Sequence, residues 1–143
     1  MNFASDNVTG AAPEILAAIE AGNTGALMPY GNDDVTRAAE AKAAALFETA
    51  AGVFFVATGT AANSLALSAT TPPWGAVFCH GGAHVFDTEL AAPEFYSGGA
   101  KLITLSGDNG KFKPATLETA IADAQVGNVH HVQPASVSIT QAT

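Results

Sequence analysis

Charge is scarce in this sequence, and positive charge is the scarcest. Only 13% of the 143 residues are charged, about half of the usual share in a soluble domain. Thirteen acidic against five basic residues leave a formal net charge of −8. A nucleic-acid-binding protein needs a basic surface that displaces counterions, and anionic membranes attract basic surfaces too. The composition therefore argues against both kinds of partner.

Cysteine is almost absent as well. Cys79 is the only one, so no internal disulfide can form and a reducing compartment is expected. The amino-terminal residues have no basic region followed by an apolar run, the pattern of a signal peptide. No apolar stretch is long enough to span a bilayer. These absences predict a cytoplasmic protein.

Two familiar nucleotide-binding motifs are missing. No Gly-Lys-Ser or Gly-Lys-Thr follows a glycine-rich loop, and the dinucleotide pattern Gly-x-Gly-x-x-Gly does not occur. What the sequence does have is apolar surface, because 48% of its residues are hydrophobic. A surface so poor in charge is expected to be partly covered, by a partner subunit or by further polypeptide.

The amino-terminal third predicts helices and a loop. A short helix starts near Pro13, since proline suits a first helical turn. Gly, Pro and Asn are frequent over 25–33, which predicts a loop. An alanine-rich helix follows over 34–49, with Asp33 or Asp34 as its N-cap.

From residue 52 onward, apolar runs alternate with helical patterns. The predicted strands are 53–57, 76–79, 102–105 and 129–139. The predicted helices are 61–69, 84–95 and 114–124. Strands that alternate with helices indicate crossover units and a mostly parallel α/β sheet. In such sheets, ligands bind beyond the carboxyl ends of the strands.

A candidate phosphate site lies at one strand-to-helix junction, Ala57-Thr58-Gly59-Thr60-Ala61-Ala62-Asn63. Gly59 lets the backbone approach a ligand closely, and Thr60 adds a hydroxyl in the first helical turn. The exposed N–H groups and the helix dipole favour an anion at this place. An ordinary turn with a threonine N-cap has the same pattern.

The histidines form two further candidates. His80 and His84 flank a glycine pair after a predicted strand, so they do not share a helix face as zinc ligands would. A histidine there can stack on a flat ring or transfer a proton near neutral pH, although a surface-loop histidine looks the same. His130 and His131 are adjacent on a predicted strand and should point to opposite faces. We expect no metal site.

Four segments in collinear order resemble the threonine aldolase and β-eliminating lyase family of pyridoxal-phosphate (PLP) enzymes. They are Phe3-Ala4-Ser5-Asp6-Asn7-Val8-Thr9, Pro29-Tyr30-Gly31-Asn32-Asp33, Ala57-Thr58-Gly59-Thr60-Ala61-Ala62-Asn63 and Ala83-His84. They look like the family's Ser-Asp-Thr-Val-Thr stretch, its Tyr-Gly-Asp-Asp loop, its phosphate turn and the Ala-His that begins its next helix. The resemblance runs over essentially the whole chain.

The resemblance implies roles for six residues. Gly59 and Thr60 would hold the cofactor phosphate, and His84 would stack on the pyridine ring near the substrate hydroxyl. His130 would be a second histidine near that hydroxyl. The implied substrate-binding residues are Ser5, which would contact the substrate carboxylate, and Tyr30, near an active site shared with a neighbouring subunit.

The same resemblance implies a three-layer α/β/α fold with a mostly parallel sheet, like the large domain of PLP-dependent transferases. Residues 1–33 would form an amino-terminal arm, and residues 34–143 the first part of that domain. The family's cofactor-binding lysine lies later than this chain extends, so we expect a fragment that is inactive alone. Its expected partners are the remaining polypeptide, or a second fragment, and further copies in a dimer or tetramer.

The implied reaction is cleavage of L-threonine or allo-threonine, which are β-hydroxy-α-amino acids, to glycine and an aldehyde. Two alternatives stay open from the sequence. One is a PLP-dependent β-elimination from another amino acid. The other is a non-catalytic α/β module that binds a phosphate-bearing ligand or a partner chain.

Overall fold

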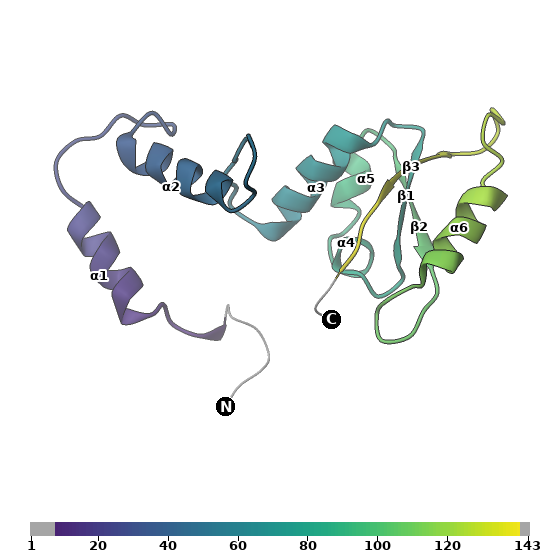
Figure 1. The fold of residues 1–143 in the computed structure, drawn as a ribbon, viewed down its shortest axis with the longest axis horizontal. Helices are drawn as coiled ribbons and strands as arrows, with labels where there is room; N and C mark the ends of the chain where they lie inside the picture. Colours follow the sequence, from purple (N-terminus) through teal and green to yellow (C-terminus); the bar gives the residue numbers. More distant parts are fainter. Residues whose placement is uncertain (1–7, 141–143) are drawn as a thin grey trace. The chain divides into compact units, whose positions relative to one another are not determined.

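The computed structural model describes residues 8–140. The chain divides between Phe54 and Phe55 into two compact units, 1–54 and 55–143. Figure 1 shows helices in the first unit and a sheet with its covering helices in the second. The division into an arm (1–33) and the start of a large domain (34–143) stays a prediction.

The first unit contains α1 (Pro13–Gly22) and α2 (Asp34–Ala45) within its described part. The predicted loop between them is confirmed, and its tight bend places Tyr30 and Gly31 at φ 63° and 76°. Neither helix has a buried residue. The second helix ends four residues earlier than the predicted 49, since Glu48 adopts a left-handed φ of 52°.

Asp33 is the N-cap of α2. It is one of the two residues that were predicted for this position. Its carboxylate accepts hydrogen bonds from the backbone N–H of Thr36 at 2.8 Å and from the Thr36 hydroxyl at 2.7 Å. These bonds, the backbone one first, lower the pKa of Asp33 below its ordinary value of 3.8. The ionised carboxylate is therefore the form that the helix start favours.

We expect α2 to lose stability in acid through this cap. A carboxyl group with a depressed folded-state pKa contributes fully above its ordinary pKa, and the contribution is lost as the pH falls through the lower folded-state value. Circular dichroism during an acid titration measures the loss of helix. In Asp33→Asn this component should vanish, because asparagine caps without titrating. Identical acid profiles for the two proteins would contradict the assignment.

The second unit is built on a parallel sheet in the order β2-β1-β3. Its strands are β1 (Gly75–His80), β2 (Lys101–Leu105) and β3 (Gln133–Val137). The helices are α3 (Gly59–Thr70), α4 (His84–Asp87), α5 (Ala92–Tyr96) and α6 (Pro114–Asp123). Strands β1 and β2 and helices α3 and α6 are confirmed within two residues of the predicted bounds.

Helices cover both faces of this sheet. Successive side chains of β1 point in opposite directions, so this strand contributes to a buried cluster on each face. One buried cluster contains Leu67 of α3, Val77, Cys79, Ala83 and Val85. The cluster on the other face contains Ala76, Phe78 and Leu105, with Leu117 and Ala120 of α6 packed against it. Figure 1 shows α3, α4 and α5 on one side of the sheet and α6 on the other. The predicted three-layer α/β/α architecture is confirmed.

The single cysteine lies in the first of these clusters. Cys79 has no exposed surface. Burial, together with the negative charge of Glu94, raises the pKa of its thiol above the ordinary value. It is therefore a neutral packing residue near pH 7.

Among residues 8–140, no helix is long and apolar enough to cross a membrane.

One predicted strand is wrong. Residues 51–56 have no regular secondary structure, and Phe54 and Phe55 are 87% and 63% exposed. A strand needs a neighbour that accepts its backbone hydrogen bonds. In the described part of the chain, the three strands of the sheet pair only with one another. An apolar sequence alone could not supply that partner.

The predicted helix over 84–95 is two helices. Leu90 and Ala91 adopt left-handed φ angles of 50° and 56° between α4 and α5, and an α-helix cannot continue through them. The fourth predicted strand lies within the segment 129–139, as β3 over Gln133–Val137. His130 and His131 precede it in a turn that Asn128 stabilises. Their predicted placement on opposite faces of a strand is therefore wrong.

Candidate functional site

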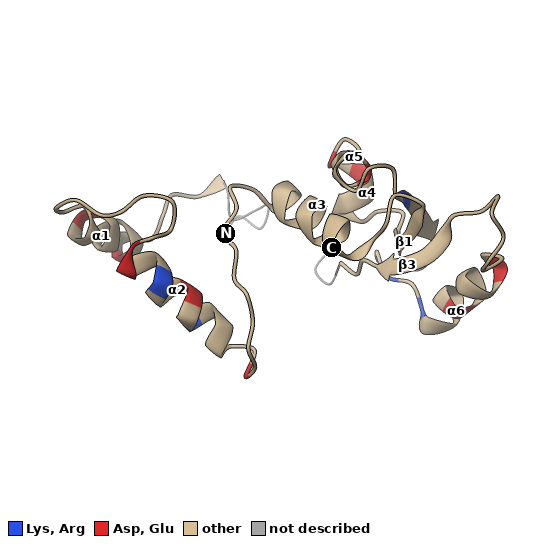
Figure 2. Ribbon diagram, turned by 90° about the horizontal axis from the view of Figure 1, so that it is seen from above, with Lys and Arg blue, Asp and Glu red and all other residues tan. Residues whose placement is uncertain are grey.

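The amino terminus of α3 is a helix start with no charge to offset its dipole. Thr58 is extended at φ −144° and ψ 157°, and its hydroxyl accepts a hydrogen bond from the Ala61 N–H at 3.1 Å. Figure 2 shows no acidic or basic residue along α3. A helix leaves its first N–H groups without backbone acceptors, and they favour an anion. A Cβ at Gly59 would meet no atom within 4 Å, so space is open in front of this turn.

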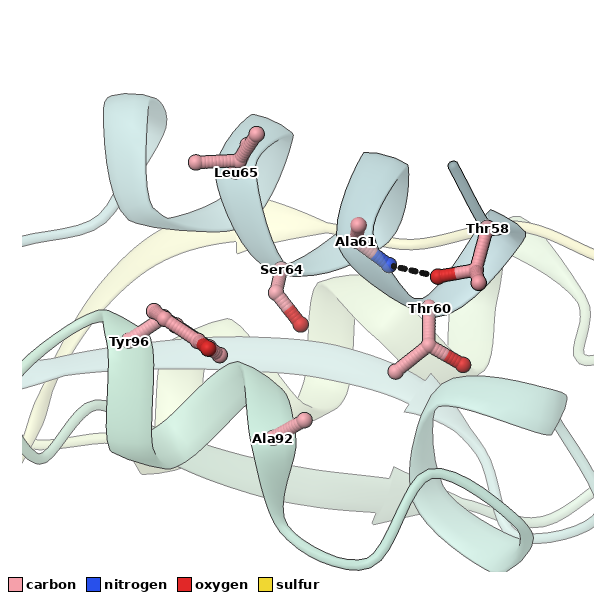
Figure 3. Close-up of a pocket in the computed structure, with 7 residues that line it drawn as sticks. All are labelled: Thr58, Thr60, Ala61, Ser64, Leu65, Ala92 and Tyr96. Atoms are coloured by element: carbon pink, nitrogen blue, oxygen red, sulfur yellow. Dashed lines mark hydrogen bonds between the residues drawn. The ribbon is translucent and has the colours of Figure 1, made fainter. Parts of the chain in front are cut away.

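A pocket of about 390 Å³ lies beside this helix start, between α3 and α5 (Figure 3). Its lining residues are Thr58, Thr60, Ala61, Ser64, Leu65, Ala92 and Tyr96. Ser64 is 1% exposed, and its hydroxyl has no hydrogen-bond partner among the described residues. Figure 3 shows that hydroxyl directed into the space between the two helices. A buried hydroxyl without a partner is costly, so a polar group placed beside Ser64 would be stabilised there.

His84 begins α4, and a buried carboxylate holds its ring. Its Nδ1 lies 2.7 Å from Oε1 of Glu89. The same oxygen accepts a hydrogen bond from Nδ2 of Asn63, also at 2.7 Å. The Glu89 side chain has no exposed surface, whereas 62% of the His84 side chain is exposed. The structure therefore joins the first turns of α3 and α4 through one carboxylate.

His80 has a structural role. Its Nδ1 accepts a hydrogen bond from the Gly82 N–H at 3.0 Å. Its Nε2 lies 3.1 Å from the carbonyl oxygen of Gly107 and must therefore donate to it. Both ring nitrogens are engaged in holding two loops together at the carboxyl end of β1. Within residues 8–140, no three His, Cys, Asp or Glu residues gather as metal ligands would.

Three further site residues were predicted, namely Ser5, Tyr30 and His130. His130 is exposed in the turn before β3, and no hydrogen bond in the described part of the chain connects it to His84. Tyr30 belongs to the first unit and is 97% exposed. Ser5 lies outside the described residues. Their roles stay predictions.

Glu89 is the residue that sequence reasoning missed. Glu89 fell inside the predicted continuous helix over 84–95, and no feature of the sequence predicted that its side chain is buried. The available signal was an acidic residue five positions after a candidate histidine, within a segment that is otherwise mostly apolar. The sequence predicted Asn63 only as part of the phosphate turn.

The family model described as beta-eliminating lyase matches residues 2–143. The chain belongs to the beta-eliminating lyase family. Two low specificity L-threonine aldolases are similar to this family member over 99% of its length. The one from Pseudomonas sp. (strain NCIMB 10558) is 45% identical, and the one from Pseudomonas aeruginosa is 43% identical.

A solved structure, that of Leishmania major threonine aldolase, matches the fold of this beta-eliminating lyase family member. The TM-score is 0.83 at 30% sequence identity, over 92% of this chain and 37% of the other. The chain spans about 40% of the length of the curated Pseudomonas relatives. The family resemblance predicted from four short segments is confirmed.

Proposed function

We propose that this chain belongs to a PLP-dependent lyase that cleaves L-threonine or allo-threonine to glycine and an aldehyde. The observation that carries the proposal is the pocket beside the uncharged start of α3, with the buried Ser64 hydroxyl directed into it. The names of the two Pseudomonas relatives supply the substrate class.

The residues at this helix start fit the phosphate of PLP. The first N–H groups of α3 and the Thr60 hydroxyl provide hydrogen-bond donors, and the open space at Gly59 allows close approach. When bound, the cofactor supplies a ring that withdraws electrons from the bond to be broken. The cofactor-binding lysine, in this proposal, belongs to polypeptide outside the present chain.

His84 has the chemistry to accept the proton of the substrate hydroxyl. Its ring is flat and largely exposed, so it can lie against the pyridine ring and still present a nitrogen. We assign supporting roles to His130 near the same hydroxyl, to Ser5 at the substrate carboxylate and to Tyr30 in a neighbouring subunit's site. We further propose a homo-oligomer, a tetramer or dimer, in the cytoplasm.

A second candidate is β-elimination from a related amino acid, which the description of the matching family favours. Both reactions use the same phosphate site. They differ in the bond that breaks, so product analysis separates them. An aldehyde and glycine indicate aldol cleavage, whereas a keto acid and ammonia indicate elimination.

The test uses the longest reading frame that contains this chain, purified with PLP. We expect visible absorbance from bound cofactor and aldehyde release from L-threonine. Thr60→Val removes one hydroxyl at constant size, and we expect roughly tenfold weaker PLP binding, as for the loss of a hydrogen bond to a charged group. Thr119→Val is the matched control on the exposed side of α6. A protein that binds no PLP, or variants with equal PLP affinity, would refute the assignment.

A further inference from the structure

The exposed ring of His84 is fixed by groups buried behind it. Nδ1 lies 2.7 Å from Oε1 of Glu89, and Nδ2 of Asn63 donates to that oxygen at 2.7 Å. We infer that Glu89 is a positioning residue, which keeps the proton of the neutral His84 ring on Nδ1 and leaves Nε2 as the proton acceptor. The consequence for catalysis rests on the proposed function, whereas the tautomer itself does not.

The hydrogen-bond inventory of Glu89 favours a proton on Nδ1 of His84. An ionised carboxylate can only accept hydrogen bonds. A neutral Glu89 with its proton on Oε2 would bury a donor, because Oε2 has no partner in the described part of the chain. Oε1 already accepts from Asn63. The short separation from Nδ1 is that of a charge-assisted N–H···O⁻ bond.

The backbone around Glu89 is shaped for this contact. Leu90 and Ala91 both adopt left-handed φ angles, which non-glycine residues rarely do. This turn leaves Leu90 99% exposed while the preceding Glu89 is buried. Such strain persists where the surrounding structure holds it, often at functional sites. A residue needed only for packing would not require a buried carboxylate here.

The arrangement also connects two parts of the proposed site. Asn63 lies in the first turns of α3, whose start is the proposed phosphate site, and His84 begins α4. Glu89 therefore sets the position of the histidine relative to the phosphate turn. A third group that orients a base in this way also fixes which ring nitrogen can take up a proton.

Nitrogen-15 NMR of the histidine ring tests the tautomer directly. The sample is the longest reading frame that contains this chain, labelled at histidine, sedimented for solid-state spectra and held at mildly alkaline pH. The His84 signals are those that disappear in His84→Gln. We expect a protonated Nδ1 and an unprotonated Nε2 in the unmodified protein. A predominantly Nε2-protonated His84 would overturn the inference, whatever a variant at Glu89 shows.

Glu89→Leu provides the second readout, since it keeps a similar size and removes the acceptor of the Nδ1 proton. We expect loss of the Nδ1-protonated majority form and a roughly 100-fold lower kcat for L-threonine with little change in KM. Glu94→Leu, the same change five residues later, should leave the His84 tautomer unchanged. An unchanged tautomer in Glu89→Leu would also overturn the inference. If the protein has no aldolase activity, the proposed function fails while the tautomer result still decides the role of Glu89.

Discussion

Replacing His84 with alanine lowers the turnover of L-threonine by roughly 10²- to 10⁴-fold, which is the usual contribution of a general acid or base. The side chain is placed for this role by its exposure and by the buried Glu89 at 2.7 Å behind it. The measurement is kcat for aldehyde release by the longest reading frame that contains this chain.

His84→Phe separates the two functions assigned to this ring. Phenylalanine keeps a flat surface for stacking and cannot accept a proton, so PLP affinity should stay near that of the unmodified protein while turnover falls as in His84→Ala. His131→Ala is the control, because that histidine is an exposed turn residue to which no role is assigned. Turnover within a fewfold of the unmodified protein in His84→Phe would remove His84 as the proton acceptor.

Gly107→Ala destabilises the second unit by about 3 kcal/mol, the upper part of the range for overpacked sites. A Cβ at this position would overlap the carbonyl oxygen of Lys111 and lie 2.8 Å from Cα of Phe112. Both are backbone atoms, which cannot rotate away as a side chain can. The Gly107 carbonyl also accepts the hydrogen bond of His80, so any shift of the loop weakens that contact.

Gly81→Ala is the matched control for this prediction. A Cβ there would lie 3.9 Å from its nearest neighbour, a Thr104 side-chain atom, which is ordinary contact. Urea unfolding followed by circular dichroism gives both free energies of unfolding. We expect Gly81→Ala to stay within about 0.5 kcal/mol of the unmodified protein. Equal stabilities of the two variants would show that the loop relaxes around the added methyl group.

The loop that contains Gly107 shows what local sequence can predict. Asp108-Asn109-Gly110-Lys111 is a turn, as expected, with Asn109 and Gly110 at φ 55° and 72°. The Lys111 N–H closes it on the Asp108 carbonyl oxygen at 3.1 Å. Asparagine and glycine tolerate these angles, so the turn follows from residue type. The close approach of Gly107 to the returning chain does not, because it depends on where the loop packs.

The candidate site also has one part that local sequence predicts and one part that depends on packing. Residue patterns located the helix start near Gly59 and Thr60 and the one at His84, while the roles of these three residues stay predictions. Glu89 was not found, because its importance arises from burial. The segment 84–95 has a helical pattern in which Glu89 is one of three acidic residues, and the left-handed Leu90 and Ala91 break it into two helices. No pattern in the sequence places Asn63 and Glu89 within 2.7 Å.

The sequence by itself determined the helix starts, the central strands and the family, because caps, prolines, apolar runs and motif order are local properties. Tertiary structure alone decided which apolar run became a strand. The runs at 53–57 and 76–79 look alike, yet within residues 8–140 only the second pairs with neighbouring strands. It also decided that Glu89 is buried and accepts a hydrogen bond from Asn63, since a contact between residues 26 apart in the chain forms only when α3 lies against the turn between α4 and α5.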